Sequence, residues 1–345
     1  MNKKHISILF LSAALVLASC GGKQKKSYDE IGESGLTTRT EHLRDNLRGA
    51  YQEQVIVGQL YGTLQGIGWT GDSARSDMCS ACGDGPAAVG YSLSGIEQGH
   101  KMNNDSLSFE AIRHDVLTNY RKGALITMTW TAPADARKPE KLKLYAERLA
   151  KYLDTLQDDY GIKAPVVLIP YPRDGQSWYT RLSSNDYQQL FHQTATMLKE
   201  QEVTNALLGY ATDGELDYCP IDDVDVIEFR HVLTATDSLA FQEKMAEALP
   251  HIIAFAQEHF KAVGMTTGIE GNTNPTFFSQ QLLPLIHQQR LNYLLLGRNY
   301  GEPTEGHYCI PFPGIDNQLM SDFVQFYNDK STIFQHNLNG LYLQQ

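Results

Sequence analysis

The chain has 345 residues, of which 42% are hydrophobic and 20% are charged, values typical of a soluble globular protein with a large core. Asp and Glu outnumber Lys and Arg by 40 to 29, giving a formal net charge of −11. Such a charge repels phosphate backbones and argues against nucleic-acid binding over a broad surface. The sequence has no apolar run of eighteen residues outside its N-terminus, which excludes a polytopic membrane protein.

The N-terminal segment resembles the signal peptide of a bacterial lipoprotein. Lys3 and Lys4 precede the apolar run Ile6–Leu17, and two small residues then lead to Cys20 and a pair of glycines. Cleavage before this cysteine leaves it as a lipid-modified N-terminus. An ordinary secretory signal followed by an incidental cysteine is the alternative. We therefore expect residues 1–19 to form the signal peptide.

Residues 20–37 are polar and rich in Gly, Lys and Ser, a composition that predicts a flexible tether between an anchor and a folded domain. The lipoprotein interpretation predicts an extracytoplasmic protein held at the outer membrane through acyl chains on Cys20. It leaves open which face of that membrane carries the protein.

Four further cysteines lie in a chain expected to reach a compartment where disulfides form. Cys79 and Cys82 have the spacing of a redox motif, but no thioredoxin-like βαβ pattern surrounds them. A structural disulfide or free thiols is therefore favoured over redox or zinc chemistry. Cys219 and Cys309 are too isolated to assign.

From residue 38 onward, short β-rich runs alternate with amphipathic helical patterns. Several of the runs are apolar almost throughout, as expected for parallel strands buried on both faces. The predicted helices include Pro139–Asp159, Ser184–Glu200 and Leu239–Ala262. The predicted strands are Gln59–Thr63, Val89–Leu93, Leu125–Trp130, Val166–Tyr171, Ala206–Thr212, Val224–Phe229, Met265–Ile269 and Tyr293–Leu296.

Eight strands separated by helices match the length and order of an α/β (β/α)8 TIM barrel. A doubly wound sheet is the alternative, but no glycine-rich phosphate loop follows the first predicted strand. No internal boundary is visible, so we expect a single domain over residues 38–345.

In TIM barrels the active site lies at the C-terminal ends of the strands. The predicted strand ends carry a ring of polar and charged residues, and several aromatic residues lie at or just beyond them. Aromatic faces stack on the C–H surfaces of sugars, so this rim predicts a groove for an oligosaccharide or polysaccharide, with core packing as the alternative for each ring. The aromatic residues are Trp69, Trp130, Trp178, Tyr171 and Tyr179.

The order of these segments resembles glycoside hydrolase family 26, best known for retaining endo-β-mannanases built on a TIM barrel. The similarity runs from Tyr61 to about Phe334, and no cofactor or metal is expected. The resemblance also implies that Asn299 contacts substrate. The segments that carry it are Gly85–Tyr91, Leu125–Trp130, Pro170–Trp178, Arg298-Asn299 and His307–Gly314.

A retaining glycosidase needs a nucleophilic carboxylate and a carboxylic acid about 5–5.5 Å apart. The resemblance implies that Glu270 is the nucleophile, but it places Arg173 at the position of the family's acid/base Glu. Arginine stays protonated and cannot donate and then retrieve a proton. Asp174, one residue further on, is the best-located replacement donor, and Arg173 is alternatively able to pair with Glu270. Other titratable groups expected nearby are Asp213, Glu228 and His231.

Further departures from the family pattern fall in the same pocket: Pro172, Thr131, Val232 and Gly297 stand where the family has His, His, Tyr and Trp. The scaffold motifs are kept, so the pattern predicts changed or lost chemistry on a kept fold. Two hypotheses follow. The chain is either a divergent retaining glycosidase acting on a β-linked glycan such as β-mannan, or a non-catalytic glycan-binding lipoprotein.

Overall fold

A computed structural model describes residues 30–49, 54–72, 75–173, 175, 177–235 and 240–344. The predicted signal peptide, the anchor residue Cys20, the first part of the tether and the predicted proton donor Asp174 lie outside the described residues. Among the helices that are described, none is both long and apolar enough to cross a membrane.

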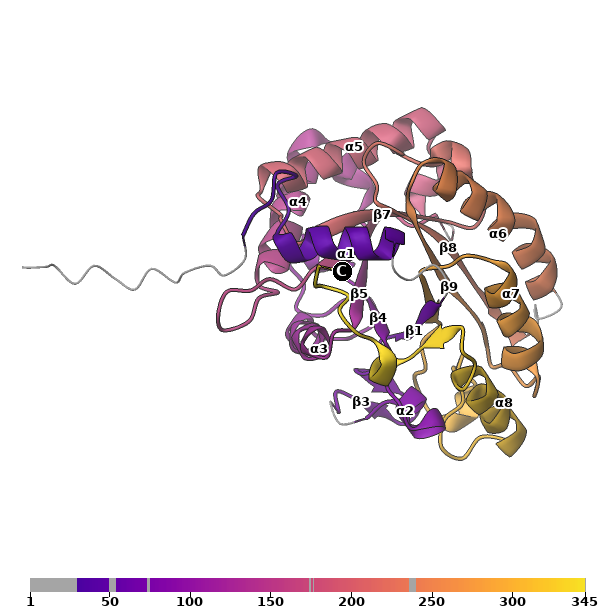
Figure 1. The fold of residues 1–345 in the computed structure, drawn as a ribbon. Helices are drawn as coiled ribbons and strands as arrows, with labels where there is room; N and C mark the ends of the chain where they lie inside the picture. The colour runs from indigo at the N-terminus through magenta and orange to yellow at the C-terminus, as the bar shows by residue number, and fades with distance from the viewer. Residues whose placement is uncertain are drawn as a thin grey trace, which may run out of the picture.

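Eight parallel strands form a closed barrel, which confirms the predicted TIM-barrel fold (Figure 1). The barrel closes because β1 pairs with β4 on one side and with β10 on the other. A short ninth strand, β11 (Thr332–Ile333), pairs with the start of β1. The barrel strands are β1 (Val55–Leu60), β4 (Ala88–Ser92), β5 (Leu125–Trp130), β6 (Val166–Pro170), β7 (Ala206–Thr212), β8 (Val226–Thr234), β9 (Ala262–Glu270) and β10 (Tyr293–Leu296).

Amphipathic helices surround the barrel and bury their apolar faces against it (Figure 1). Serine side chains cap three of them: Ser76 before α2, Ser108 before α3 and Ser183 before α5. A two-residue hairpin, β2 (Gln65–Gly66) and β3 (Trp69–Thr70), follows β1. The helices are α1 (Thr38–Gly49), α2 (Asp77–Cys82), α3 (Phe109–Arg121), α4 (Pro139–Asp154), α5 (Ser184–Glu200), α6 (Ala240–Glu258), α7 (Leu283–Gln288) and α8 (Asn317–Tyr327).

Helix α1 packs at the N-terminal end of the barrel, opposite the strand ends that form the expected site. The backbone N–H of Thr37 donates to the carbonyl of Thr204, which precedes β7 (2.8 Å). The side chain of Asn292, which precedes β10, donates to the carbonyl of Leu47. Residues 30–37 therefore lead into the domain at the end that faces away from the C-terminal strand ends.

The strand predictions were correct for β5, β7 and β10 and shifted for β1 and β8. The apolar run Val55–Val57 begins β1 four residues earlier than predicted, and Tyr61 ends it because its φ of 55° is incompatible with a strand. Strand β8 extends to Thr234, which pairs in register with Glu270 of β9. Glu228 therefore lies in the middle of its strand and not at the end.

Candidate active site

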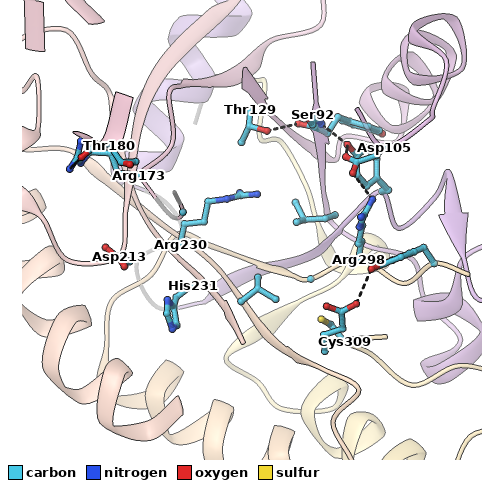
Figure 2. Close-up of a pocket in the computed structure, with 18 of the residues that line it drawn as sticks. Ser92, Asp105, Thr129, Arg173, Thr180, Asp213, Arg230, His231, Arg298 and Cys309 are labelled. Atoms are coloured by element: carbon cyan, nitrogen blue, oxygen red, sulfur yellow. Dashed lines mark hydrogen bonds and ion pairs between the residues drawn. The ribbon is translucent and has the colours of Figure 1, made fainter. Parts of the chain in front are cut away.

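A cleft of about 820 Å³ opens at the C-terminal ends of the barrel strands, as the fold predicted (Figure 2). Its wall is polar and charged, with carboxylates, arginines and tyrosines contributed by loops that follow most of the strands. The lining residues with ionisable side chains are Tyr61, Tyr91, Asp105, Arg173, Asp213, Glu215, Arg230, His231, Glu270, Arg298, Tyr300 and Cys309.

Glu270 is the last residue of β9, and its half-buried side chain lines this cleft. Oε1 accepts one hydrogen bond from Nδ1 of His307 (2.7 Å) and another from the hydroxyl of Tyr300 (3.0 Å). Because a carboxylate only accepts, Nδ1 is the protonated nitrogen of this imidazole. Oε2 accepts no hydrogen bond from the residues that the structure describes. The carboxylate thus has one held oxygen and one oxygen without such a bond.

The two donors are themselves stacked. The rings of Tyr300 and His307 are nearly parallel, with centroids 4.4 Å apart, and the guanidinium of Arg298 lies 4.0 Å from the centre of the Tyr300 ring. Burial raises the pKa of Tyr300, and the hydrogen bond to Glu270 and the charge of that carboxylate raise it further. The phenol therefore keeps its proton and remains a donor.

Arg298 connects this group to Asp105 on the same side of the cleft (Figure 2). Its Nη1 pairs with Oδ1 of Asp105 at 2.7 Å, and the hydroxyl of Tyr61 donates to Oδ2 of the same carboxylate at 2.6 Å. Burial and the adjacent Asp105 raise the pKa of Tyr61 far above its ordinary value. The contacts form a continuous chain from the end of β1 to Glu270.

Arg173 occupies the end of β6 but does not pair with Glu270, so that predicted alternative is wrong. Its guanidinium is buried and donates to Glu215 through Nε (3.0 Å) and Nη2 (2.6 Å), and to the carbonyls of Tyr179 and Thr180 (both 3.3 Å). The ring of Tyr218 lies 3.5 Å from it. These contacts satisfy the arginine within its own wall.

Glu228 is also absent from the cleft wall. It is fully buried inside the barrel, where it accepts hydrogen bonds from Tyr293 (2.7 Å) and Thr266 (3.0 Å) and pairs with Arg230 (3.2 Å). Arg230, two residues further along β8, extends into the cleft (Figure 2). The carboxyl is thus part of the core and is not available as a proton donor.

Two other predicted titratable groups do line the cleft. Asp213 follows β7, is 38% exposed, and has the ammonium of Lys244 at 4.0 Å. His231 lies in β8 beside Arg230, on the same side of the cleft as Asp213 (Figure 2). Of the carboxyls in the described wall, Asp213 has the weakest ionic contact, because those of Asp105, Glu215 and Glu270 each accept short hydrogen bonds.

The predicted aromatic platforms are not in the cleft wall. Trp130 is 0% exposed, packs on Tyr171 and donates through Nε1 to Glu97 (3.2 Å). Tyr171 and Tyr179 are likewise buried and pack edge to face against each other. Core packing, the alternative considered from sequence, describes all three. The prediction that Trp130 shares the cleft with Glu270 is wrong.

Trp69, Trp178 and Asn299 also have structural partners. Trp69 is buried and donates to Asp77 (2.8 Å), and Trp178 donates to the carbonyl of Ala132 (2.8 Å). The amide of Asn299 is buried and holds the backbone N–H groups of Cys309 and Ile310. None of the three is among the residues that line the cleft. The substrate contacts predicted for them are not supported by this placement.

The cleft floor beside Glu270 is built from small residues. A Cβ atom added at Gly297 would lie 2.4 Å from Sγ of Cys309 and 3.4 Å from Val232. Val232 is 42% exposed and faces the cleft. The side chain of Cys309 thus fills the space beside Gly297, where the resemblance places a Trp, and Val232 stands where the resemblance places a Tyr.

All four described cysteines are free thiols. This agrees with one of the two favoured alternatives, free thiols, and not with a disulfide. Burial raises the pKa of Cys82 and of Cys219 to about 12, which makes both poor nucleophiles. The described residues contain no cluster of three His, Cys, Asp or Glu side chains able to hold a metal ion.

The contacts around Glu270 involve four residues for which the sequence predicted no role: Tyr300, His307, Asp105 and Tyr61. His307 begins one of the segments that carry the family resemblance, and that position was the available signal. The others lie in loops, where neither apolar periodicity nor a motif marks a side chain that turns into the cleft.

No family model matches the chain. Comparison with solved structures gives a β-mannanase of glycoside hydrolase family 26 from Bacteroides ovatus, with a TM-score of 0.81, 27% identity and coverage of 89% of this chain and 98% of that one. An endo-β-1,4-mannanase from Cellulomonas fimi has a TM-score of 0.76 and 22% identity, over 91% of this chain and 79% of that one. A family 26 endo-β-1,4-mannanase from Bacillus sp. JAMB-750 has a TM-score of 0.77 and 19% identity, over 92% and 96%. The chain is therefore similar in sequence and fold to a β-mannanase of glycoside hydrolase family 26, and it shares its barrel fold with the other two mannanases.

Proposed function

We propose that the protein is a divergent retaining glycoside hydrolase that acts on a β-linked glycan such as β-mannan, with Glu270 as its nucleophile. The observation that carries the proposal is the placement of Glu270 at the end of β9, in the cleft, with Oε1 bound by two donors and Oε2 bound by none of the described residues. The mannanase activity of the structural relatives supports the choice of substrate.

In the proposed reaction, Oε2 of Glu270 attacks the anomeric carbon and the bond from this carbon to the leaving oxygen breaks. The leaving oxygen takes the bonding electron pair and is released as an alcohol if a donor protonates it, or as an anion if it is already acidic. Water then attacks the anomeric carbon of the glycosyl ester, loses a proton, and Glu270 departs as a carboxylate.

Two carboxyl groups are candidates for the proton donor. Arg173 is unsuited because it remains a cation and its guanidinium is held by Glu215 and two carbonyls. Asp174 remains the predicted donor. Asp213 is the second candidate, because it lines the cleft and lacks a short ionic contact.

The test uses substrates that need different amounts of acid help. Loss of a general acid costs about 10²–10⁴ in rate when the leaving group is a sugar alkoxide, but little when it is an acidic phenol. We expect weak or no cleavage of mannan polysaccharide, detectable release of phenol from an activated aryl β-mannoside or related aryl glycoside, and a covalent adduct with a 2-fluoro glycoside. Glu270→Gln should abolish release and adduct, while the exposed control Glu110→Gln should not.

Failure to cleave aryl glycosides and to form the adduct would refute the enzyme proposal. Fast hydrolysis of mannan would show that an efficient proton donor exists and that the arginine at position 173 does not limit hydrolysis.

A second candidate function is non-catalytic glycan binding in the same cleft. The observation that favours it is the complete engagement of Arg173, which turns the family's acid/base position into a structural contact. This function predicts saturable binding of β-glycans. The affinity should not change with incubation time, and no reducing ends should be released. Calorimetric titration together with a reducing-end assay distinguishes the two functions.

We also propose that the protein is lipid-anchored outside the cytoplasm through Cys20. The arrangement of the domain supports this, because residues 30–37 lie at the N-terminal end of the barrel while the cleft opens at the C-terminal end. About ten residues separate Cys20 from the described chain, a reach of about 35 Å when extended. An anchor on this side leaves the cleft open to solvent.

A further inference from the structure

We infer that Tyr300 and His307 are positioning residues, which together hold Glu270 so that Oε2 is the oxygen presented to the ligand. The inference rests on the proposed function for its catalytic meaning and on the contacts of the described residues for its geometry. It assigns distinct roles to the two oxygens of one carboxylate.

Both donors converge on the same atom of Glu270. Nδ1 of His307 lies 2.7 Å from Oε1 of Glu270, and the hydroxyl of Tyr300 lies 3.0 Å from it. Rotation of the carboxylate that exchanged its two oxygens would break both hydrogen bonds before it could form them again. The two bonds therefore select one orientation, and charge-assisted hydrogen bonds are about twice as strong as neutral ones.

Tyr300 and His307 are held in place in the absence of any ligand. Tyr300 is sandwiched between the ring of His307 and the guanidinium of Arg298. The backbone N–H of Tyr300 donates to the carbonyl of His307 (3.0 Å), and that of Gly271 donates to the carbonyl of Tyr308 (2.8 Å). These bonds tie the loop that carries both donors to the residue that directly follows Glu270.

Arg298 also connects the stack to neighbouring strands of the barrel. Arg298 is held by Asp105, whose other oxygen accepts from Tyr61. The hydroxyl of Tyr61 in turn accepts from the backbone N–H of Ser92 (3.0 Å) and from the side chain of Asn103 (3.0 Å). The stack that holds Glu270 is therefore anchored to β1 and β4, the strands that follow β10 around the barrel, as well as to its own loop.

The chemical consequence concerns both halves of the reaction. When Oε2 forms its bond to the anomeric carbon, Oε1 becomes the carbonyl oxygen of the ester and keeps the same two donors. When that bond breaks, the negative charge returns to a carboxylate that is already in place.

The experiment measures the rate at which a 2-fluoro glycoside with an acidic phenol leaving group forms the Glu270 adduct in the purified protein. Small misplacements of a reacting group cost about 10²-fold in rate. We expect His307→Ala to slow adduct formation to this extent, mainly in the maximal rate of inactivation and not in the glycoside concentration that gives half of that rate. His307→Asn, whose side-chain N–H₂ occupies a position close to that of Nδ1, should recover most of the loss.

Tyr300→Phe keeps the ring stack and removes the hydroxyl, and it should slow adduct formation by a smaller factor than His307→Ala. The matched controls are His287→Asn, which changes a histidine–carboxylate pair on α7 far from the cleft, and Tyr160→Phe, a change at an exposed tyrosine. Wild-type rates in His307→Ala and Tyr300→Phe, with the wild type itself reactive, would overturn the inference.

A second measurement decides the inference even if the wild type forms no adduct, an outcome that refutes the proposed function instead. In ¹⁵N-histidine-labelled protein, we expect a downfield Nδ1 proton of His307 that is lost in Glu270→Gln, while the signals of His287 stay unchanged. Absence of such a proton in the wild type, or its persistence in Glu270→Gln, would show that His307 does not hold this carboxylate.

Discussion

Arg173 donates two hydrogen bonds to a single carboxylate oxygen of Glu215, from Nε at 3.0 Å and from Nη2 at 2.6 Å. The arginine comes from the end of β6 and the glutamate from the loop after β7, so the pair ties neighbouring strand ends together. Arg173, which the resemblance places at the family's acid/base position, is thus part of the cleft wall. The effect of Arg173 on catalysis and its contribution to stability can therefore be measured separately.

The stability value is tested by Glu215→Gln. Arg173 is only 2% exposed, whereas the side chain of Glu215 is 48% exposed, so the variant leaves a buried cation without its carboxylate. We expect the free energy of unfolding to fall by about 1.5–3 kcal/mol, the range for hydrogen bonds to charged groups. Urea denaturation monitored by circular dichroism measures this change.

The control for that prediction is Glu110→Gln, which removes the carboxylate of an exposed pair with Arg113. Exposed pairs contribute about 0–1 kcal/mol, so this variant should unfold close to the wild type. Equal effects of the two substitutions would mean that the Arg173–Glu215 pair behaves as an ordinary surface contact.

Trp130→Phe separates core packing from glycan stacking. The indole N–H of Trp130 donates to Glu97, a buried carboxylate, so its removal leaves that acceptor short of one partner. We expect the free energy of unfolding to drop by about 1–3 kcal/mol. Glycan affinity, measured by calorimetry below the unfolding range, should stay at the wild-type value. A selective loss of affinity with unchanged stability would restore the stacking role.

The sequence was sufficient to predict the barrel because each strand is specified locally. β5, β7 and β10 are apolar runs with clear ends, and their predicted bounds match the structure. The first strand was misplaced because its end depends on the left-handed backbone of Tyr61, which no apolar pattern marks. Strand β8 continues through the polar residues Arg230 and His231, where alternation gives no signal to continue.

The site was predicted less well than the fold, for a different reason. Position along the chain was enough to place Glu270 and Arg173 at or just after the C-terminal ends of their strands, but it did not show which way a side chain turns. Trp130 ends its strand facing the core, and Tyr300 reaches Glu270 from a loop thirty residues away. Side-chain direction depends on tertiary packing, which the sequence pattern does not contain.

The close approach of Cys309 to Gly297 in the cleft floor gives a steric prediction. A Cβ at Gly297 would lie 2.4 Å from Sγ of Cys309, so Gly297→Ala must displace that side chain or the backbone. Overpacking of this kind costs about 1–3 kcal/mol. The loss of stability should be largely reversed in the double variant with Cys309→Ala, and Gly49→Ala, where nothing lies within 4 Å, serves as the control. Additive effects in the double variant would contradict the contact.

The anchor proposal is tested by Cys20→Ser. If Cys20 is lipidated, stable attachment to a membrane depends on its acyl chains. We expect the variant to move from the membrane pellet to the soluble fraction on ultracentrifugation, while Cys79→Ser remains in the pellet. Membrane association that survives Cys20→Ser would refute the lipoprotein interpretation.

Azide tests whether the second half of the proposed reaction lacks a base. With arginine in place of the acid/base, no group at that position removes a proton from the water that attacks the glycosyl ester of Glu270. Azide is an anion and needs no deprotonation, so its addition should speed turnover of an activated aryl mannoside by about 10-fold or more, within the 10²–10⁴ that general base catalysis contributes. Release of phenol measures the rate, and a glycosyl azide product identified by mass spectrometry shows which nucleophile reacted.

Asp213→Asn is the informative companion, since this residue lines the cleft with only a 4.0 Å contact to Lys244. If Asp213 is the relocated base, the wild type will be indifferent to azide and Asp213→Asn will respond to it.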